Sequence, residues 1–189
     1  MPIKINNAPA ESFDILKSKA QSHHHELITH DTNGNQNHYI PHKVYDLNIF
    51  NLAEGGELSN TQQSAWRYII QDENGHNHVV EIGINEVLDE HNLHFINTGN
   101  HVNNFLKIYE NISEHEYVKY KDYEINLVRS NQIYLLAIWL RGVNHDHEFF
   151  IPIPPVNNRF EANKTYSYGK FSNLLKKISR EYVKNNMRR

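Results

Sequence analysis

The chain has 189 residues, with 19 Lys and Arg, 22 Asp and Glu, 14 His and a formal net charge of −3. This length fits one domain with a sizeable core, and the balanced charge gives no overall attraction to nucleic acid or to an anionic membrane. The chain contains no cysteine, which excludes disulfides, thiolate nucleophiles and Cys-type zinc sites.

No targeting or membrane segment stands out. No apolar run reaches the ~18 residues that a transmembrane helix needs, and residues 1–21 lack the apolar stretch of a Sec signal. We therefore expect a cytoplasmic protein without a membrane partner. Export by a specialised secretion system would leave the same pattern, so this alternative stays open.

The first 37 residues are mostly polar. Phe13, Leu16 and Ala20 fall on one side of a short helix that Ser12 would cap. The following segment, residues 22–38, has few apolar side chains to offset its ordering entropy. We predict a flexible N-terminal segment over residues 1–37 and a single α+β domain over 38–189.

The first half of this domain shows strand patterns and one helix pattern. Residues 39–45 predict a short strand, which Pro41 would place at a sheet edge. Residues 65–84 predict a hairpin with its turn at 72–75, and residues 93–96 predict another short strand. Apolar residues at helical spacing predict a helix over 98–112.

The longest apolar run, residues 133–140, lies in the middle of three predicted strands over 123–153. A strand that is apolar on both faces must be covered on both. A second helix is predicted over 167–185, with Ser167 as its cap. The fold class is therefore α+β, an antiparallel sheet of about five or six strands packed by the two helices. If both helices lie on one face of the sheet, a dimer partner or the N-terminal segment would cover the other face.

Three segments resemble a group of uncharacterised bacterial proteins. These proteins carry similar Ala-Trp-Arg-Tyr and Ala-Leu-Trp-Leu segments, the second followed by a Phe/Leu-Ile-Pro strand. The matching residues are 65–68, 137–140 and 151–152. The resemblance spans roughly residues 40–182 and implies no activity.

Two H-x-H pairs are candidate metal ligands: His76 with His78, and His145 with His147. Residues i and i+2 of a strand share a face, so each pair could reach one ion, and the two pairs together would supply four nitrogen ligands. The alternative is that they are solvated histidines at turns. We expect no cofactor, and the alternative is a zinc-like divalent ion bound by these histidines.

Three further features carry weaker signals. His91 and His94 have i, i+3 spacing, although the local pattern is not helical. Residues 97–100 precede the first predicted helix, whose free N–H groups could bind an anion, with simple capping as the alternative. Arg67 lies among aromatic residues of a predicted strand, where an arginine usually has a carboxylate partner.

The predicted C-terminal helix has a basic face that includes Lys176, Lys177 and Arg180. Such a face could bind phosphates of a nucleic acid, but more often it is simply the solvated side of an amphipathic helix. We expect no nucleic-acid partner.

The leading hypothesis is a non-catalytic protein-interaction module, acting as an adaptor, chaperone or inhibitor-like protein on a protein partner or as a homodimer. It rests on the lack of a recognisable catalytic motif. The first alternative is a His-dependent enzyme with or without a metal, and the second is nucleic-acid binding through the C-terminal helix.

Overall fold

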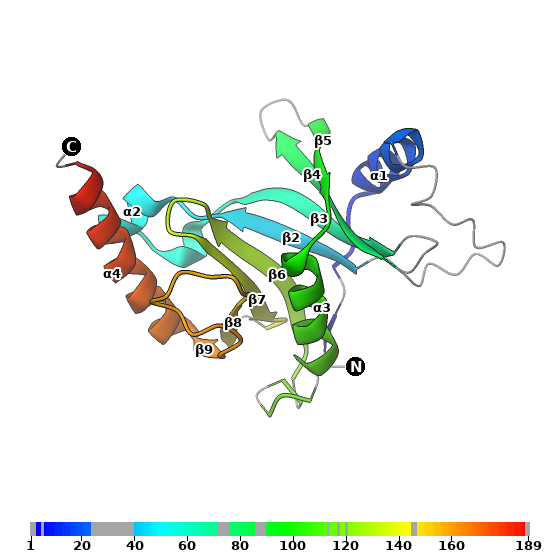
Figure 1. Ribbon diagram of the computed structural model, residues 1–189. Coiled ribbons are helices and arrows are strands. Elements are labelled where there is room, and N and C mark those ends of the chain that lie inside the picture. Colours follow the sequence, from blue (N-terminus) through cyan, green and yellow to red (C-terminus); the bar gives the residue numbers. More distant parts are fainter. Residues whose placement is uncertain are drawn as a thin grey trace.

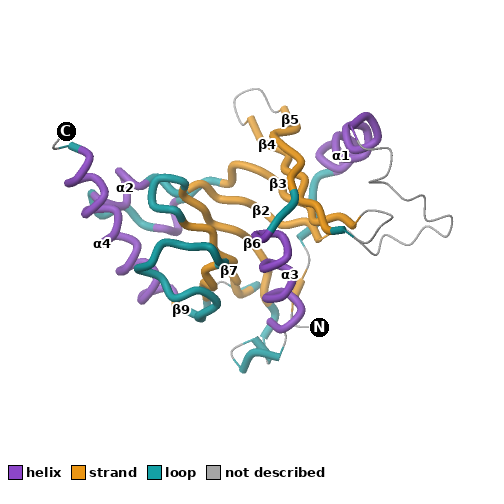
Figure 2. Tube along the Cα trace, viewed as in Figure 1, coloured by secondary structure: helices purple, strands orange, loops and turns teal. Residues whose placement is uncertain are grey.

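A computed structural model describes residues 3–4, 6–23, 40–71, 76–85, 90–112, 114–116, 118–119, 121–144 and 147–187. In this part of the chain, nine strands form one sheet, accompanied by four α-helices and one 3₁₀ helix. Figure 2 shows the strands as one continuous layer with the helices around it. None of the described helices is long and apolar enough to cross a membrane.

The elements follow in chain order: β1 (Ile3–Lys4), α1 (Ala10–His23), β2 (Ile40–Asp46), α2 (Ile49–Ala53), η1 (Leu58–Asn60), β3 (Gln63–Gln71), β4 (Asn77–Asn85), β5 (Glu90–Asn97), α3 (Asn100–Ile112), β6 (Tyr123–Ser130), β7 (Leu135–Gly142), β8 (Glu148–Pro152), β9 (Tyr166–Ser167) and α4 (Tyr168–Asn186). The strand order is β5-β4-β3-β2-β6-β7-β8-β9, and β1 also pairs with β6. The β2–β6 and β1–β6 pairs are parallel and the others are antiparallel.

The predicted α+β class, hairpin, three-stranded meander and two helices are confirmed, but the predicted number of strands is too small. The additional strands include β1 and β9, which have two residues each, too few to show a hydrophobic period. The prediction of an edge position for residues 39–45 is also wrong, because β2 lies between β3 and β6. Pairing of β2 with β6 begins at Lys43, beyond Pro41, so the missing N–H of Pro41 breaks no bond to β6.

Helices on opposite faces of the sheet cover the central strands. On one face, Phe105 of α3 shares a core with Ile138 and Leu140 of β7. On the other face, Phe171 of α4 shares a core with Trp139 of the same strand. The expected double coverage of this strand therefore comes from α3 and α4, within one chain.

The N-terminal helix covers a further part of the sheet. Leu16 of α1 is buried with Trp66 and Tyr68 of β3, on the face opposite to α3. Ser12 lies inside α1 instead of capping it, and its hydroxyl contacts that of Tyr68. Figure 1 shows α1 and α4 at opposite ends of the molecule. The predicted flexibility of 1–37 falls partly on residues 24–37, which lie outside the described residues.

Candidate active site

A buried carboxylate, Glu81, lies at the centre of a charged cluster on the α3 face of the sheet. Its side chain is fully buried, and Arg67 lies directly opposite it across the β3–β4 pair. The Nε and Nη2 atoms of Arg67 donate to Oε2 of Glu81 over 3.1 and 2.6 Å. The expectation that Arg67 has a carboxylate partner is therefore confirmed. Such a pair satisfies charges that would be very costly to bury alone.

A second arginine joins the cluster from the meander. Arg129 of β6 donates from Nη1 to Oε2 of Glu81 over 2.7 Å and from Nε and Nη2 to the carboxylate of Asp46 on β2. Burial would raise the pKa of Asp46, but the hydrogen bonds and the charge of Arg129 hold it below its usual value. All the hydrogen bonds to Glu81 from described residues therefore go to Oε2, and Oε1 is buried without one.

The nearest partner for Oε1 is His94, whose Nδ1 lies 3.5 Å away. Glu81 pairs with Phe95 and Ile82 pairs with Leu93, so His94 is the extra residue of a β-bulge in β5. Bulges redirect side chains and are common beside active sites. The ring lies against Gly83, where an added Cβ would be 1.8 Å from Nε2. Only glycine therefore leaves room for this imidazole.

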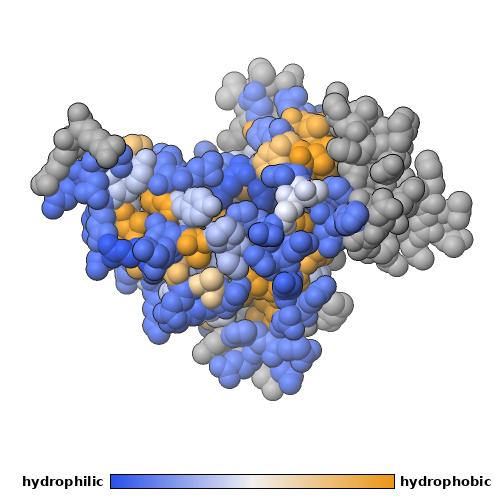
Figure 3. Space-filling view, viewed as in Figure 1, coloured by the Kyte–Doolittle hydropathy of each residue, from blue (hydrophilic) through white to orange (hydrophobic). Residues whose placement is uncertain are grey.

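His94 and Gly83 form part of the wall of a hollow of about 760 Å³. Its other walls are the end of β2, α2 and its following loop, the start of β3 and the β4–β5 edge. Most lining side chains are amides or hydroxyls: Asn48, Asn51, Asn60, Thr61, Gln62, Gln63, Ser64, Asn85 and Asn92. Figure 3 shows mostly hydrophilic colours between α2 and the β4–β5 pair. A polar hollow of this size can hold a small-molecule substrate.

A second bulge supplies another wall residue. Val44 pairs with Ala65 and Tyr45 with Gln63, so Ser64 is the extra residue in β3, and its hydroxyl donates to the carbonyl of Val44. Both bulge residues thus line the same hollow.

The pair formed by Glu81 and His94 is suited to proton transfer. With Nδ1–H directed to the carboxylate, Nε2 of a neutral imidazole is a free acceptor at the wall of the hollow. Glu81 would also stabilise the imidazolium that forms when Nε2 takes a proton. Half of the His94 side chain is exposed, so a ligand can reach it.

The predicted metal ligands lie elsewhere. His76 is exposed and His78 is half-buried at the start of β4, His147 is exposed before β8, and His145 lies outside the described residues. His78 and His147 are at the same end of the sheet, but β4 and β8 are five positions apart in the strand order. At about 4.8 Å per strand, one shared ion would have to bridge roughly 24 Å along the sheet.

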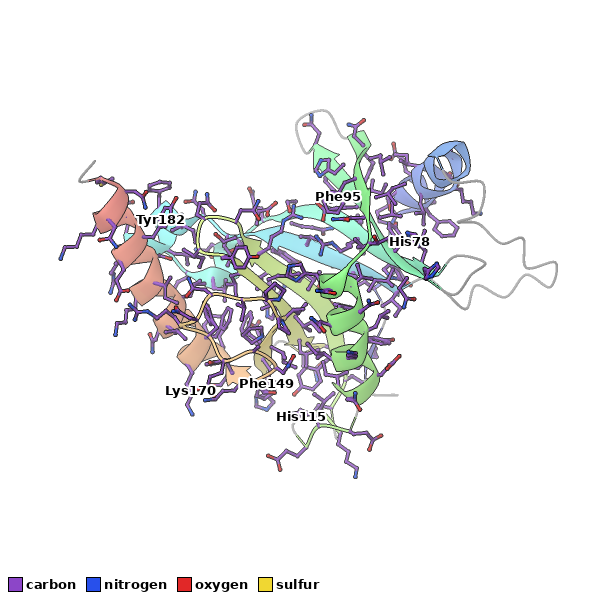
Figure 4. All side chains as sticks on the ribbon, in the orientation of Figure 1. His78, Phe95, His115, Phe149, Lys170 and Tyr182 are labelled. Atoms are coloured by element: carbon purple, nitrogen blue, oxygen red, sulfur yellow. The ribbon has the colours of Figure 1, made fainter. Side chains whose placement is uncertain are left out.

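Figure 4 shows this separation. His78 and Phe149, which is two residues after His147, lie on different sides of α3. The described residues contain no group of three or more His, Asp or Glu side chains arranged for a metal ion. A metal at either pair stays a prediction.

Two of the three basic residues predicted to bind anions make contacts within the fold. Lys176 donates to Glu57 over 2.6 Å, and Nε of Arg180 donates to the carbonyl of Ala53 at the end of α2. Lys177 is exposed. These contacts hold α4 against α2, and nucleic-acid binding there stays a prediction.

Sequence reasoning noted His94 only for its spacing from His91, and it did not single out Arg129 or Asp46. His91 instead lies 3.5 Å from Glu11 of α1. The strand alternation of β4 would have placed Glu81 among buried neighbours, which was the available signal. No protein-family model, curated protein or solved structure matches the chain. The resemblance to a bacterial group stays a prediction.

Proposed function

We propose that the protein is a histidine-dependent enzyme in which His94 acts as a general base, oriented by Glu81. Nδ1 of His94 lies 3.5 Å from Oε1 of Glu81, and Oε1 has no other partner among the described residues. This observation carries the proposal. Nε2 would take a proton from a water or a substrate hydroxyl and later return it to the leaving group.

The walls of the hollow support a hydroxyl-rich, uncharged substrate. Amide side chains both donate and accept hydrogen bonds, which matches the hydroxyl groups of sugars and related polyols. The described wall residues include no Lys or Arg, and of the acidic ones, Asp46 is bound to Arg129 and Glu57 to Lys176. Neither an anionic nor a strongly cationic substrate is favoured by this wall.

The protein-interaction hypothesis has less support in the described residues. Their large exposed apolar side chains are Phe50, Tyr134, Val143 and Met187. These belong to α2, the β6–β7 turn, the β7–β8 turn and the end of α4, so they define no single docking face. Scattered exposed apolar residues are normal on a protein surface. The interaction module stays a hypothesis.

Hydrolysis of p-nitrophenyl acetate, an activated ester that a neutral imidazole nitrogen attacks, tests whether Nε2 of His94 is accessible and unprotonated, as a general base must be. We expect His94→Asn to reduce the protein-dependent rate to the background of the other histidines, because the oriented imidazole is lost. Glu81→Gln should also lower the rate. His115→Asn, which removes a half-buried histidine elsewhere (Figure 4), is the matched control and should change the rate little.

Equal small losses in His94→Asn and His115→Asn would refute the general base. Because Glu81→Gln leaves two arginines with one carboxylate fewer, it can fail to fold, and the decision then rests on the two histidine variants. Competition by a series of methyl glycosides tests the substrate class separately. No inhibition by any of them would reject that class without affecting the general base.

A further inference from the structure

A second hollow, of about 350 Å³, lies on the other side of the charged cluster. Its walls include Arg67, Arg129, Phe95, His101 at the start of α3, and Tyr134 of the β6–β7 turn. Asp46 and His94 line the first hollow, whereas both arginines line the second. The cluster therefore presents hydrogen-bond donors to this second hollow.

The first turn of α3 supplies further donors. Gly99 has a positive φ of 126°, and its carbonyl accepts from the N–H groups of Val102 and Asn103. Asn100 and His101 come before the first residue whose N–H group finds an acceptor inside the helix, so their own N–H groups have no acceptor within it. Both residues line the hollow. Together with the helix dipole, these N–H groups favour an anion.

The arginines retain donors for a ligand. No hydrogen bond to a described residue uses Nη1 of Arg67, since its bonds to Glu81 use Nε and Nη2. Burial, and then the charge of Arg67, lower the pKa values of both His101 and His42. The positive charge of Arg67 therefore extends to the first turn of α3 and to the interior beneath it.

An unpartnered acceptor lines a small cavity that shares walls with the hollow. His42 of β2 is fully buried, and its Nδ1 lies 2.9 Å from the carbonyl of Ile40, so Nδ1 carries the proton of the neutral ring. Nε2 is then an acceptor, and it has no hydrogen-bond partner. His42 lines a cavity of about 30 Å³, whose other walls include Arg67 and His101 of the second hollow. This space is sufficient for one water or one ligand oxygen.

We propose that the second hollow binds a phosphate group that keeps a proton. Its unprotonated oxygens accept from Arg67 and from the N–H groups of α3, and its P–OH group donates to Nε2 of His42, directly or through one water. Sulfate offers the same acceptors but no proton at neutral pH, so the site should prefer phosphate. The proposal does not depend on His94, and the ligand is inorganic phosphate or a phosphomonoester.

Amide chemical shifts of the full chain test this site during separate titrations at about pH 5.5 with inorganic phosphate, phenyl phosphate and sulfate, because below the second pKa of a phosphomonoester, about 6, both phosphates keep a proton and sulfate has none. We expect phosphate to shift the signals of Asn100 and His101 and to bind about tenfold more tightly than sulfate, as one additional hydrogen bond predicts. Phenyl phosphate that binds as well as inorganic phosphate would identify a phosphomonoester as the ligand class. Phenyl phosphate that binds much more weakly would identify the free ion.

His42→Asn should abolish the preference for phosphate, because its amide can still donate to the carbonyl of Ile40 but cannot reach the position of Nε2. Lys107→Gln removes an exposed charge from the same helix and should leave the preference unchanged. Equal affinities for phosphate and sulfate in the wild-type protein, or no shifts at the start of α3, would overturn the proposal. That comparison needs no variant, so it decides the matter even if His42→Asn does not fold.

Discussion

His42 is a fully buried histidine that makes the stability of this fold depend on pH. Its ring stacks on Phe105 of α3, with 4.7 Å between the ring centroids. Burial, together with the nearby charge of Arg67, lowers its pKa to about 3. Below pH ~6.5 this histidine gains a proton in the unfolded chain but stays neutral in the folded chain. The contribution of His42 to stability is therefore complete above that pH and is lost as the pH falls.

Replacing His42 by Asn should flatten this pH dependence. Between pH 6.5 and 4.5, we expect the free energy of unfolding of the wild-type protein to fall by roughly 2–3 kcal/mol more than that of the variant. Arg67 and His101, the charged and titratable groups nearby, are present in both proteins. Urea denaturation at several pH values measures the difference, and parallel curves would show that His42 is not buried in its neutral form.

Single residues of the site were predictable only where the strand pattern is regular. Arg67 lies in a regular stretch of β3, so its need for a carboxylate could be inferred. His94 and Ser64 each occupy a bulge, where the two-residue period fails and the facing direction cannot be assigned. Arg129 lies 48 positions from Glu81, and no local pattern connects such distant residues.

At the scale of elements, α1 is an integral part of the core. The sequence pattern identified a short helix with Leu16 on its apolar side, but the polar residues after it suggested a flexible segment. In the structure, Leu16 is 1% exposed and packs with the aromatic residues of β3. Periodicity marks which face of a helix is apolar, but it does not say what that face contacts.

Leu16→Ala should lower the free energy of unfolding by about 2–5 kcal/mol, the usual cost of a cavity at a buried leucine. Asp14→Ala changes an exposed residue of the same helix and should stay within about 0.5 kcal/mol of the wild type. Urea denaturation measures both. A Leu16→Ala variant as stable as Asp14→Ala would mean that α1 does not pack against β3 in solution.

Across the whole molecule, the proposed site depends on joining two parts of the sheet. Glu81 and His94 come from the β3–β4–β5 part, whereas Arg129 comes from the meander. Figure 1 shows β4 and β5 turned out of the plane of β6–β8. Arg129 and Arg67 together occupy Oε2 of Glu81, which leaves Oε1 for His94. The environment of the His94 ring therefore depends on contacts from both parts of the sheet.

In the proposed mechanism, Glu81 holds the proton of neutral His94 on Nδ1 and leaves Nε2 free as a base. Long-range ¹H–¹⁵N correlation spectra identify which ring nitrogen carries the proton, and the His94→Asn variant assigns the signals. We predict the Nδ1–H form for neutral wild-type His94. A neutral His94 with its proton on Nε2 would contradict it.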